Sequence, residues 1–104
     1  AQQSVKNVTL ADDIITYAVS LIRATRESGE IMSGASPRAA LLLANASRAR
    51  AALQGRNYVI PDDVKAIALP ALRHRVILSP IAEIEGRSAD ELIRDIIEQT
   101  QAPR

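Results

Sequence analysis

The stretch "SPRAALLLANASRARAALQG", residues 36–55, decides the fold, because its alanines and leucines lie on nearly every side of a helix. A helix that is apolar almost all round is typically buried on all sides. We therefore predict that residues 37–54 form the central helix of the domain, with Leu42 and Ala46, one turn apart, in the core. Gly55 follows, at a position where glycine ends a helix without steric cost.

The start of this helix breaks a rule that the rest of the chain follows. Ser36 suits the capping position, and the fixed φ of Pro37 suits the first helical position. The next residue is Arg38, although the free amides of a helix start disfavour a cation by about 0.3–1 kcal/mol. The other predicted helix starts carry acidic residues instead: "ADD" at 11–13, "PDD" at 61–63 and "SADE" at 88–91.

Two explanations of Arg38 are open at this point. An anion bound at the helix start would reverse the cost, because the free amides and the planar guanidinium could share a phosphate. Alternatively, the arginine is exposed and only reaches into water.

Three other helices follow from apolar periodicity. Residues 11–28 place an apolar stripe on one face. A helix that starts at Pro61 has Pro70 inside its apolar pattern, so we expect a kink or a break there. Residues 88–99 begin with a capping box and continue with one apolar face, whereas residues 79–86 fit either a helical turn or an extended segment. No stretch is a convincing strand, so the predicted fold is all-α, a small four-helix domain.

The composition excludes several kinds of site. The 104 residues contain no cysteine, one histidine and only two aromatic residues, both tyrosines. Disulfides and thiolate or histidine-pair metal sites therefore lack their parts, and stacking of nucleic-acid bases has little support. His74 fits a surface or helix-end role, and Asp12–Asp13 and Asp62–Asp63 fit first-turn helix positions. Because no GxxxxGK[ST] phosphate loop occurs either, we predict no metal site and no complete catalytic site in this chain.

Charge is unevenly distributed along a chain whose formal net charge is +1. Residues 37–76 hold seven Lys or Arg against two Asp, whereas residues 79–104 are acidic. A basic middle segment can meet phosphates, although a solvated face is the commoner meaning of such a bias. No long apolar run or signal peptide is visible, so we expect a cytoplasmic protein without a membrane span.

Three motifs occur in a specific order: "GASPR" at 34–38, "ALQGRNYVIPDDV" at 52–64 and "LRHR" at 72–75. Together with "RATRES" at 23–28, they resemble the small C-terminal lid domain of the MoxR branch of AAA+ ATPases. The resemblance spans nearly the whole chain from about residue 8. It implies that residues 11–100 form a helical AAA+ lid, that residues 1–10 are a linker from an upstream ATPase core, and that residues 101–104 are a tail.

In that family the arginine of "GASPR" is the sensor-2 residue. The resemblance therefore implies that Arg38 reaches the γ-phosphate of ATP, with Gly34, Ser36 and Pro37 positioning it. The upstream core would hold ATP, Mg²⁺ and the Walker residues, and the chain alone would bind no cofactor. The full-length protein would be a ring-forming, hexameric ATPase that remodels or matures partner proteins in a chaperone-like way. Such proteins often act beside a protein with a von Willebrand factor A-like domain, and nucleic acid is not an implied partner.

One position departs from the family pattern, and two other functions stay open. Ile60 stands where such lids often have a threonine that caps the next helix, which puts the tightness of that helix start in doubt. The segment "GRNYVIPDDVKAIA", 55–68, superficially resembles the loop and last helix of a histone fold, so a small DNA-binding domain is one alternative. The other is an interaction module that binds a partner helix through the isoleucine-rich helix 88–99.

Overall fold

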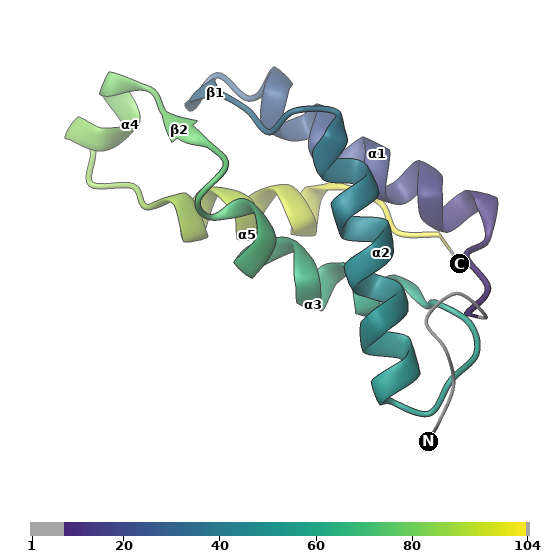
Figure 1. The fold of residues 1–104 in the computed structure, drawn as a ribbon. Coiled ribbons are helices and arrows are strands. Elements are labelled where there is room, and N and C mark those ends of the chain that lie inside the picture. Colours follow the sequence, from purple (N-terminus) through teal and green to yellow (C-terminus); the bar gives the residue numbers. More distant parts are fainter. Residues whose placement is uncertain (1–7, 104) are drawn as a thin grey trace.

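The computed structural model describes residues 8–103, which fold into five helices and two very short strands (Figure 1). The helices are α1 (Asp12–Glu27), α2 (Arg38–Leu53), α3 (Pro61–Leu72), α4 (Pro80–Ile84) and α5 (Ala89–Gln99). The strands are β1 (Ile31–Ser33) and β2 (Ile77–Leu78). The all-α class is confirmed, α1, α2 and α5 lie within a residue of the predicted ranges, and α3 starts at Pro61 as predicted.

The four long helices pack against one another around a single core. α2 packs against α1 and α3, and α5 packs against α3 and α1 on another side. The strands and α4 lie together at one end of the molecule, and the C-terminal segment ends at the opposite end (Figure 1). The largest fully buried apolar side chains come from all four long helices: Leu21, Leu43, Val64, Leu72 and Ile93.

The prediction that α2 is buried all round is wrong. One face is buried, formed by Ala39, Leu43, Ala44, Ser47 and Ala51. On the other side the exposed fraction is 66% for Leu41, 38% for Leu42 and 86% for Leu53, and Ala46 is half-buried. The physical reason is that only α1 and α3 pack against α2 to any extent. Apolar composition alone does not distinguish a buried face from a face left open.

The prediction of no strand is also wrong, by one short ladder. β1 and β2 pair antiparallel, with Ile31 opposite Leu78 and Ser33 opposite Ile77. The pairing joins the segment that follows α1 to the segment that follows α3. Strands of two and three residues are too short to show an alternating pattern in a sequence.

Two uncertain segments of the prediction are resolved as helix. α3 runs through Pro70 without a break and ends two residues later. Proline has no amide hydrogen, so Pro70 cannot donate to the Ala66 carbonyl four residues earlier. Pro70 and Ala66 are both exposed, so this carbonyl lies on the solvent side of α3. Residues 79–86 contain α4, whose start is capped by the Ser79 hydroxyl accepting from the Ala82 amide at 3.2 Å.

Residues 1–7 of the predicted linker, and residue 104 of the predicted tail, lie outside the described residues. The last part of the linker is attached to the helical body. Val8 is buried in the core, and the Thr9 amide donates to the Asn57 carbonyl at 2.8 Å. In return, the Val59 amide donates to the Thr9 carbonyl at 3.0 Å. Val59 is buried, whereas its neighbour Tyr58 is about half exposed.

Candidate functional site

The first turn of α2 carries Arg38, whose side chain is exposed. Pro37 has the helical angles φ −56° and ψ −26°, and the Ser36 carbonyl accepts from the Ala39 amide at 2.9 Å. The helix therefore starts within a residue of the predicted position, but the prediction that Ser36 caps it is wrong, because the capping position is Pro37 and no side-chain cap hydrogen bond forms there. α2 has no acidic residue in its first turn, unlike α1, α3 and α5. No described residue forms a salt bridge with Arg38.

The segment before Arg38, Gly34–Arg38 (the GASPR segment), is fastened to α1. Thr25 is completely buried, and its hydroxyl accepts from the Ala35 amide at 3.0 Å. Gly34 lies directly on the α1 backbone: a Cβ at this position would be 2.6 Å from the Thr25 carbonyl oxygen and 2.7 Å from the Arg26 Cα. Only glycine fits such a close approach. The sequence contained one signal for Thr25, a polar residue on an otherwise apolar helix face.

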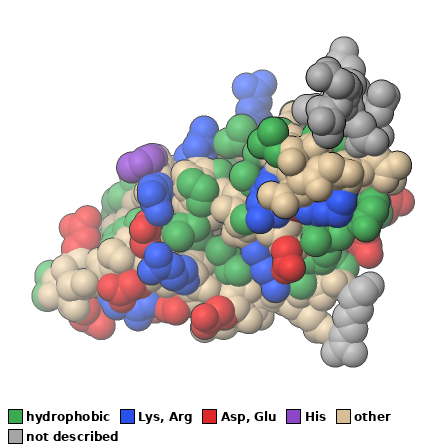
Figure 2. Space-filling model, turned by 90° about the horizontal axis from the view of Figure 1, so that it is seen from below, with side chains coloured by type: hydrophobic (Ala, Val, Ile, Leu, Met, Phe, Trp, Pro, Cys, Tyr) green, Lys and Arg blue, Asp and Glu red, His purple; other side chains and the backbone are tan. Residues whose placement is uncertain are grey.

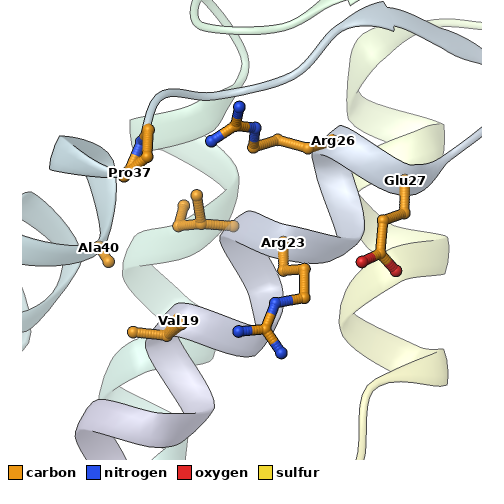
Figure 3. Close-up of a pocket in the computed structure, with 7 residues that line it drawn as sticks. Val19, Arg23, Arg26, Glu27, Pro37 and Ala40 are labelled. Atoms are coloured by element: carbon orange, nitrogen blue, oxygen red, sulfur yellow. The ribbon is translucent and has the colours of Figure 1, made fainter.

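A groove of about 450 Å³ lies between the C-terminal half of α1 and the start of α2 (Figure 3). Its residues are Val19, Ile22, Arg23, Arg26, Glu27, Pro37 and Ala40. In Figure 3 the Arg26 side chain extends toward Pro37, and Glu27 is the one acidic residue of the groove. Neither arginine of the groove forms a salt bridge with a described residue. Together with Arg38, this concentration of cations favours an anionic ligand at the start of α2.

The far end of α2 is held by a buried carboxylate. Asp63, in the first turn of α3, has no solvent-exposed side-chain surface. It accepts from Arg50 of α2 at 2.6 Å and from two nitrogens of Arg56, each at 2.7 Å. Its second oxygen also accepts from the Ile60 amide at 2.9 Å. This last bond satisfies the Ile60 amide itself, whereas no side-chain cap forms for the free amides of the first turn of α3, as the isoleucine at this position leads one to expect.

The contacts of Asp63 set its ionisation. Burial alone raises the pKa of this carboxyl, but the hydrogen bonds from Arg56, the Ile60 amide and Arg50 outweigh burial and lower the pKa to about 2. Asp63 is therefore a permanent anion at neutral pH. It joins α2, the connector 55–60 and α3, and with both arginines satisfied by it, this cluster has the character of a structural joint rather than a ligand site.

Other residues considered as site candidates are dispersed. His74 is exposed beyond the end of α3, and Asp12 and Asp13 lie exposed in the first turn of α1. Among residues 8–103, no group of three or more His, Asp or Glu is placed to hold a metal ion. In the same range, no helix has both the length and the apolar character needed to cross a membrane.

One of the two alternative functions, the interaction module, loses its structural premise. The apolar face of α5, proposed for binding a partner helix, is used inside the domain, because Leu92, Ile93 and Ile96 are buried. On the face shown in Figure 2, blue Lys and Arg side chains are separated by green hydrophobic and red acidic side chains. That face therefore has no continuous basic surface of the kind that duplex DNA binding requires.

Comparison with known proteins agrees with this architecture. The family model described as an AAA lid domain matches residues 23–96. A solved structure from Cytophaga hutchinsonii, described as a "putative ATPase", superposes with a TM-score of 0.89 and 34% identity, covering 96% of this chain and 33% of that one. The chain therefore belongs to the AAA lid domain family.

Curated relatives indicate the branch of the family to which the chain belongs. Protein MoxR of Methylorubrum extorquens is 38% identical over 74 residues, which are 70% of this chain and 22% of the relative. Chaperone MoxR1 of Mycobacterium tuberculosis is 32% identical over 100 residues, covering 88% of this chain and 26% of the relative. The uncharacterized protein YeaC of Bacillus subtilis is 38% identical over 102 residues, covering 98% of this chain and 32% of the relative. These matches identify the chain as a lid of the MoxR type, and the chain spans about a third or less of each relative.

Proposed function

We propose that this lid serves a MoxR-type AAA+ ATPase and that Arg38 is its sensor-2 arginine. In this proposal Arg38 contacts the γ-phosphate of ATP, which an ATPase core domain holds together with Mg²⁺. The observation that carries the proposal is the placement of Arg38. It is a cation in the first turn of a helix, exposed, and free of any carboxylate partner among the described residues.

The chemistry of this position suits a phosphate better than any partner within the chain. The backbone amides at the start of α2 favour an anion, and a guanidinium offers two parallel donors to phosphate oxygens. During transfer of the γ-phosphoryl group, negative charge shifts among its oxygens, and a prepositioned arginine stabilises that charge. Gly34, Ser36 and Pro37 position Arg38 in this proposal because they fix the path of the backbone into α2.

The exposed face of α2 supports the same proposal. Arg38, Leu41, Leu42 and Asn45 recur at helical spacing and lie on one side of α2, away from the buried face. Docking of this apolar side on the core domain would cover the two leucines and bring Arg38 to the nucleotide in one movement. A lid that changes its position with nucleotide state would in this way couple ATP hydrolysis to movement.

The proposal for the whole protein follows the relatives. One of them is named a chaperone, and we infer that the full-length protein is a hexameric ring in the cytoplasm that remodels or matures partner proteins. The core domain and the neighbouring subunits are then the first partners of this lid. A protein with a von Willebrand factor A-like domain is the proposed external partner.

The test compares Arg38→Ala with a matched arginine in the full-length ATPase. Arg94 is exposed on α5 and serves as the control. We expect Arg38→Ala to slow ATP hydrolysis by about 10²-fold or more, Arg38→Lys to recover little, and Arg94→Ala to have no effect. The melting temperature of the lid should stay unchanged or rise slightly with Arg38→Ala, since a cation leaves a helix start. Unchanged hydrolysis by Arg38→Ala, measured per folded molecule, would overturn the proposal.

A further inference from the structure

We propose that Thr25 is a positioning residue for Arg38: its buried hydroxyl fixes the GASPR segment on α1 and thereby determines where the guanidinium of Arg38 is delivered. This inference rests on the proposed function of Arg38. It concerns a residue on a different helix from Arg38, 13 positions earlier in the chain.

The hydroxyl of Thr25 uses both of its hydrogen-bonding roles. It donates to the Ile22 carbonyl within α1 at 2.6 Å and accepts from the Ala35 amide at 3.0 Å. Both Thr25 and Ala35 are buried. Water therefore cannot replace the hydroxyl without rearrangement, and its removal leaves the Ala35 amide buried without a partner.

A second contact fixes the same point of the segment. Gly34 lies against the backbone of Thr25 and Arg26, closely enough that even a methyl group would collide. The segment is therefore held at Ala35 by a hydrogen bond and at Gly34 by direct backbone contact. Neither contact alone determines both the height of the segment above α1 and its register along α1.

The backbone between this anchor and Arg38 has little freedom. Only Ser36 and Pro37 intervene. Proline fixes its own φ, and the Ser36 carbonyl is committed to the Ala39 amide in the first turn of α2. A displacement at Ala35 therefore moves the start of α2 as a unit, and a misplacement of about 1 Å at a reacting centre can cost about 10²-fold in rate.

Ser47 provides a matched comparison within the same chain. It is the other fully buried serine or threonine among the described residues, and its hydroxyl donates to the Leu43 carbonyl of its own helix at 2.6 Å. No described backbone amide from another segment donates to it. Loss of the Ser47 hydroxyl should therefore affect packing, whereas loss of the Thr25 hydroxyl should also release the GASPR segment.

The experiment measures kcat and KM for ATP in the full-length ATPase carrying Thr25→Val, Thr25→Ser or Ser47→Ala, alone and with Arg38→Ala. We expect Thr25→Val to lower kcat about fivefold to tenfold or more, the rate equivalent of at least one lost hydrogen bond, with KM nearly unchanged. Thr25→Ser should recover most of kcat, and Ser47→Ala should keep it. In the Arg38→Ala background Thr25→Val should have no further effect on kcat, because the group that it positions is gone.

A second pair of variants keeps the test valid if Thr25→Val does not fold. Thr25→Ser and Thr25→Cys both remove the methyl group, but the thiol is a weaker hydrogen-bond acceptor and donor than the hydroxyl, and its sulfur is larger. We expect kcat per folded molecule to be lower for Thr25→Cys than for Thr25→Ser, and equal values would overturn the inference.

The inference would also fail if Thr25→Val lowered the kcat of the Arg38→Ala enzyme by the same factor as it lowers the kcat of the unmodified enzyme. If Arg38→Ala itself has no effect, the proposed function fails. If Arg38→Ala slows hydrolysis and Thr25→Val does not, the inference about Thr25 alone fails.

Discussion

Replacing Asp63 with asparagine is expected to destabilise the domain by about 2–3 kcal/mol at neutral pH. The buried carboxylate receives hydrogen bonds from Arg50, Arg56 and the Ile60 amide. Asparagine keeps the size of the side chain and one acceptor oxygen, but it removes the charge. It also turns an amide donor toward two arginine donors.

The pKa of Asp63 gives the magnitude. Lowering the pKa of a carboxyl from 3.8 to about 2 means that its charged form stabilises the fold by about 2 kcal/mol relative to its neutral form. Removing one partner of a fully buried ion pair costs about 3–5 kcal/mol. The two arginine side chains remain 21% and 33% exposed, so water can partly hydrate them after the change. The expected loss of stability therefore lies near the lower figure, at about 2–3 kcal/mol rather than 5 kcal/mol.

The same carboxylate makes the effect dependent on pH. Because the folded-state pKa lies below the unfolded value, the stabilisation is fully present above about pH 4 and disappears as the pH falls through the folded-state pKa of about 2. Asp63→Asn cannot lose this contribution by protonation. The difference in stability between the two chains should therefore shrink steadily between pH 4 and pH 2.

Urea denaturation of the 104-residue chain at a series of pH values measures both effects. The control is Asp62→Asn, which changes the exposed neighbour in the same first turn of α3 and should alter stability by about 0.5 kcal/mol or less. Equal urea midpoints for Asp63→Asn and the unmodified chain at pH 7 would refute the reasoning. A difference that stays constant down to pH 2 would show that the charge of Asp63 is not its cause.

Three further outcomes follow from the described contacts. Leu43→Ala should cost about 2–5 kcal/mol because Leu43 is fully buried, whereas Leu42→Ala should cost less than about 1 kcal/mol; similar urea midpoints for both would mean that the buried face of α2 is wrongly assigned. Gly34→Ala should destabilise by about 1–3 kcal/mol or more through collision with the α1 backbone, whereas Gly29→Ala, with open space around it, should be tolerated; thermal melting of both variants checks this. The purified 104-residue chain should hydrolyse no ATP because its sequence lacks a phosphate loop, and steady-state turnover in a coupled assay would contradict this.

Much of the fold was predictable because the helices carry strong local signals. The capping box at Ser88 and the acidic first turns marked the helix starts, and the apolar stripe of 11–28 identified residues that are buried. Leu42 was misassigned because an all-apolar helix fits two situations: burial within the domain, and a face left for another domain. The strand pair was missed because its information lies in pairing between distant segments rather than in either segment.

The candidate site was predictable in one part only. Arg38 stands out in the sequence because it contradicts the preference of a helix start, and that contradiction is local. Thr25 gave a weaker signal, since a threonine on an apolar helix face has many structural explanations. Its contact with Ala35 spans ten residues and depends on how the GASPR segment returns to α1. Such long-range contacts become visible only in the folded structure.

The fully buried Thr, Ser and Asp side chains among the described residues all lie in α2 or in segments that contact its ends. Thr25 fixes the segment that leads into α2, Ser47 lies within α2, and Asp63 binds Arg50 in its last turn. Both ends of α2 are thus held by specific hydrogen bonds, which restrict geometry more than apolar packing does. α2 therefore presents its open face, with Arg38 at one end, in a fixed orientation.

The two ends should respond differently to mutation: changes at Asp63 should lower the stability of the domain, whereas changes at Thr25 should lower kcat in proportion to the misplacement of Arg38. If Asp63 and Thr25 variants of equal stability slowed hydrolysis equally, the rigidity of the whole helix, and not the position of its start, would be the property that matters for catalysis.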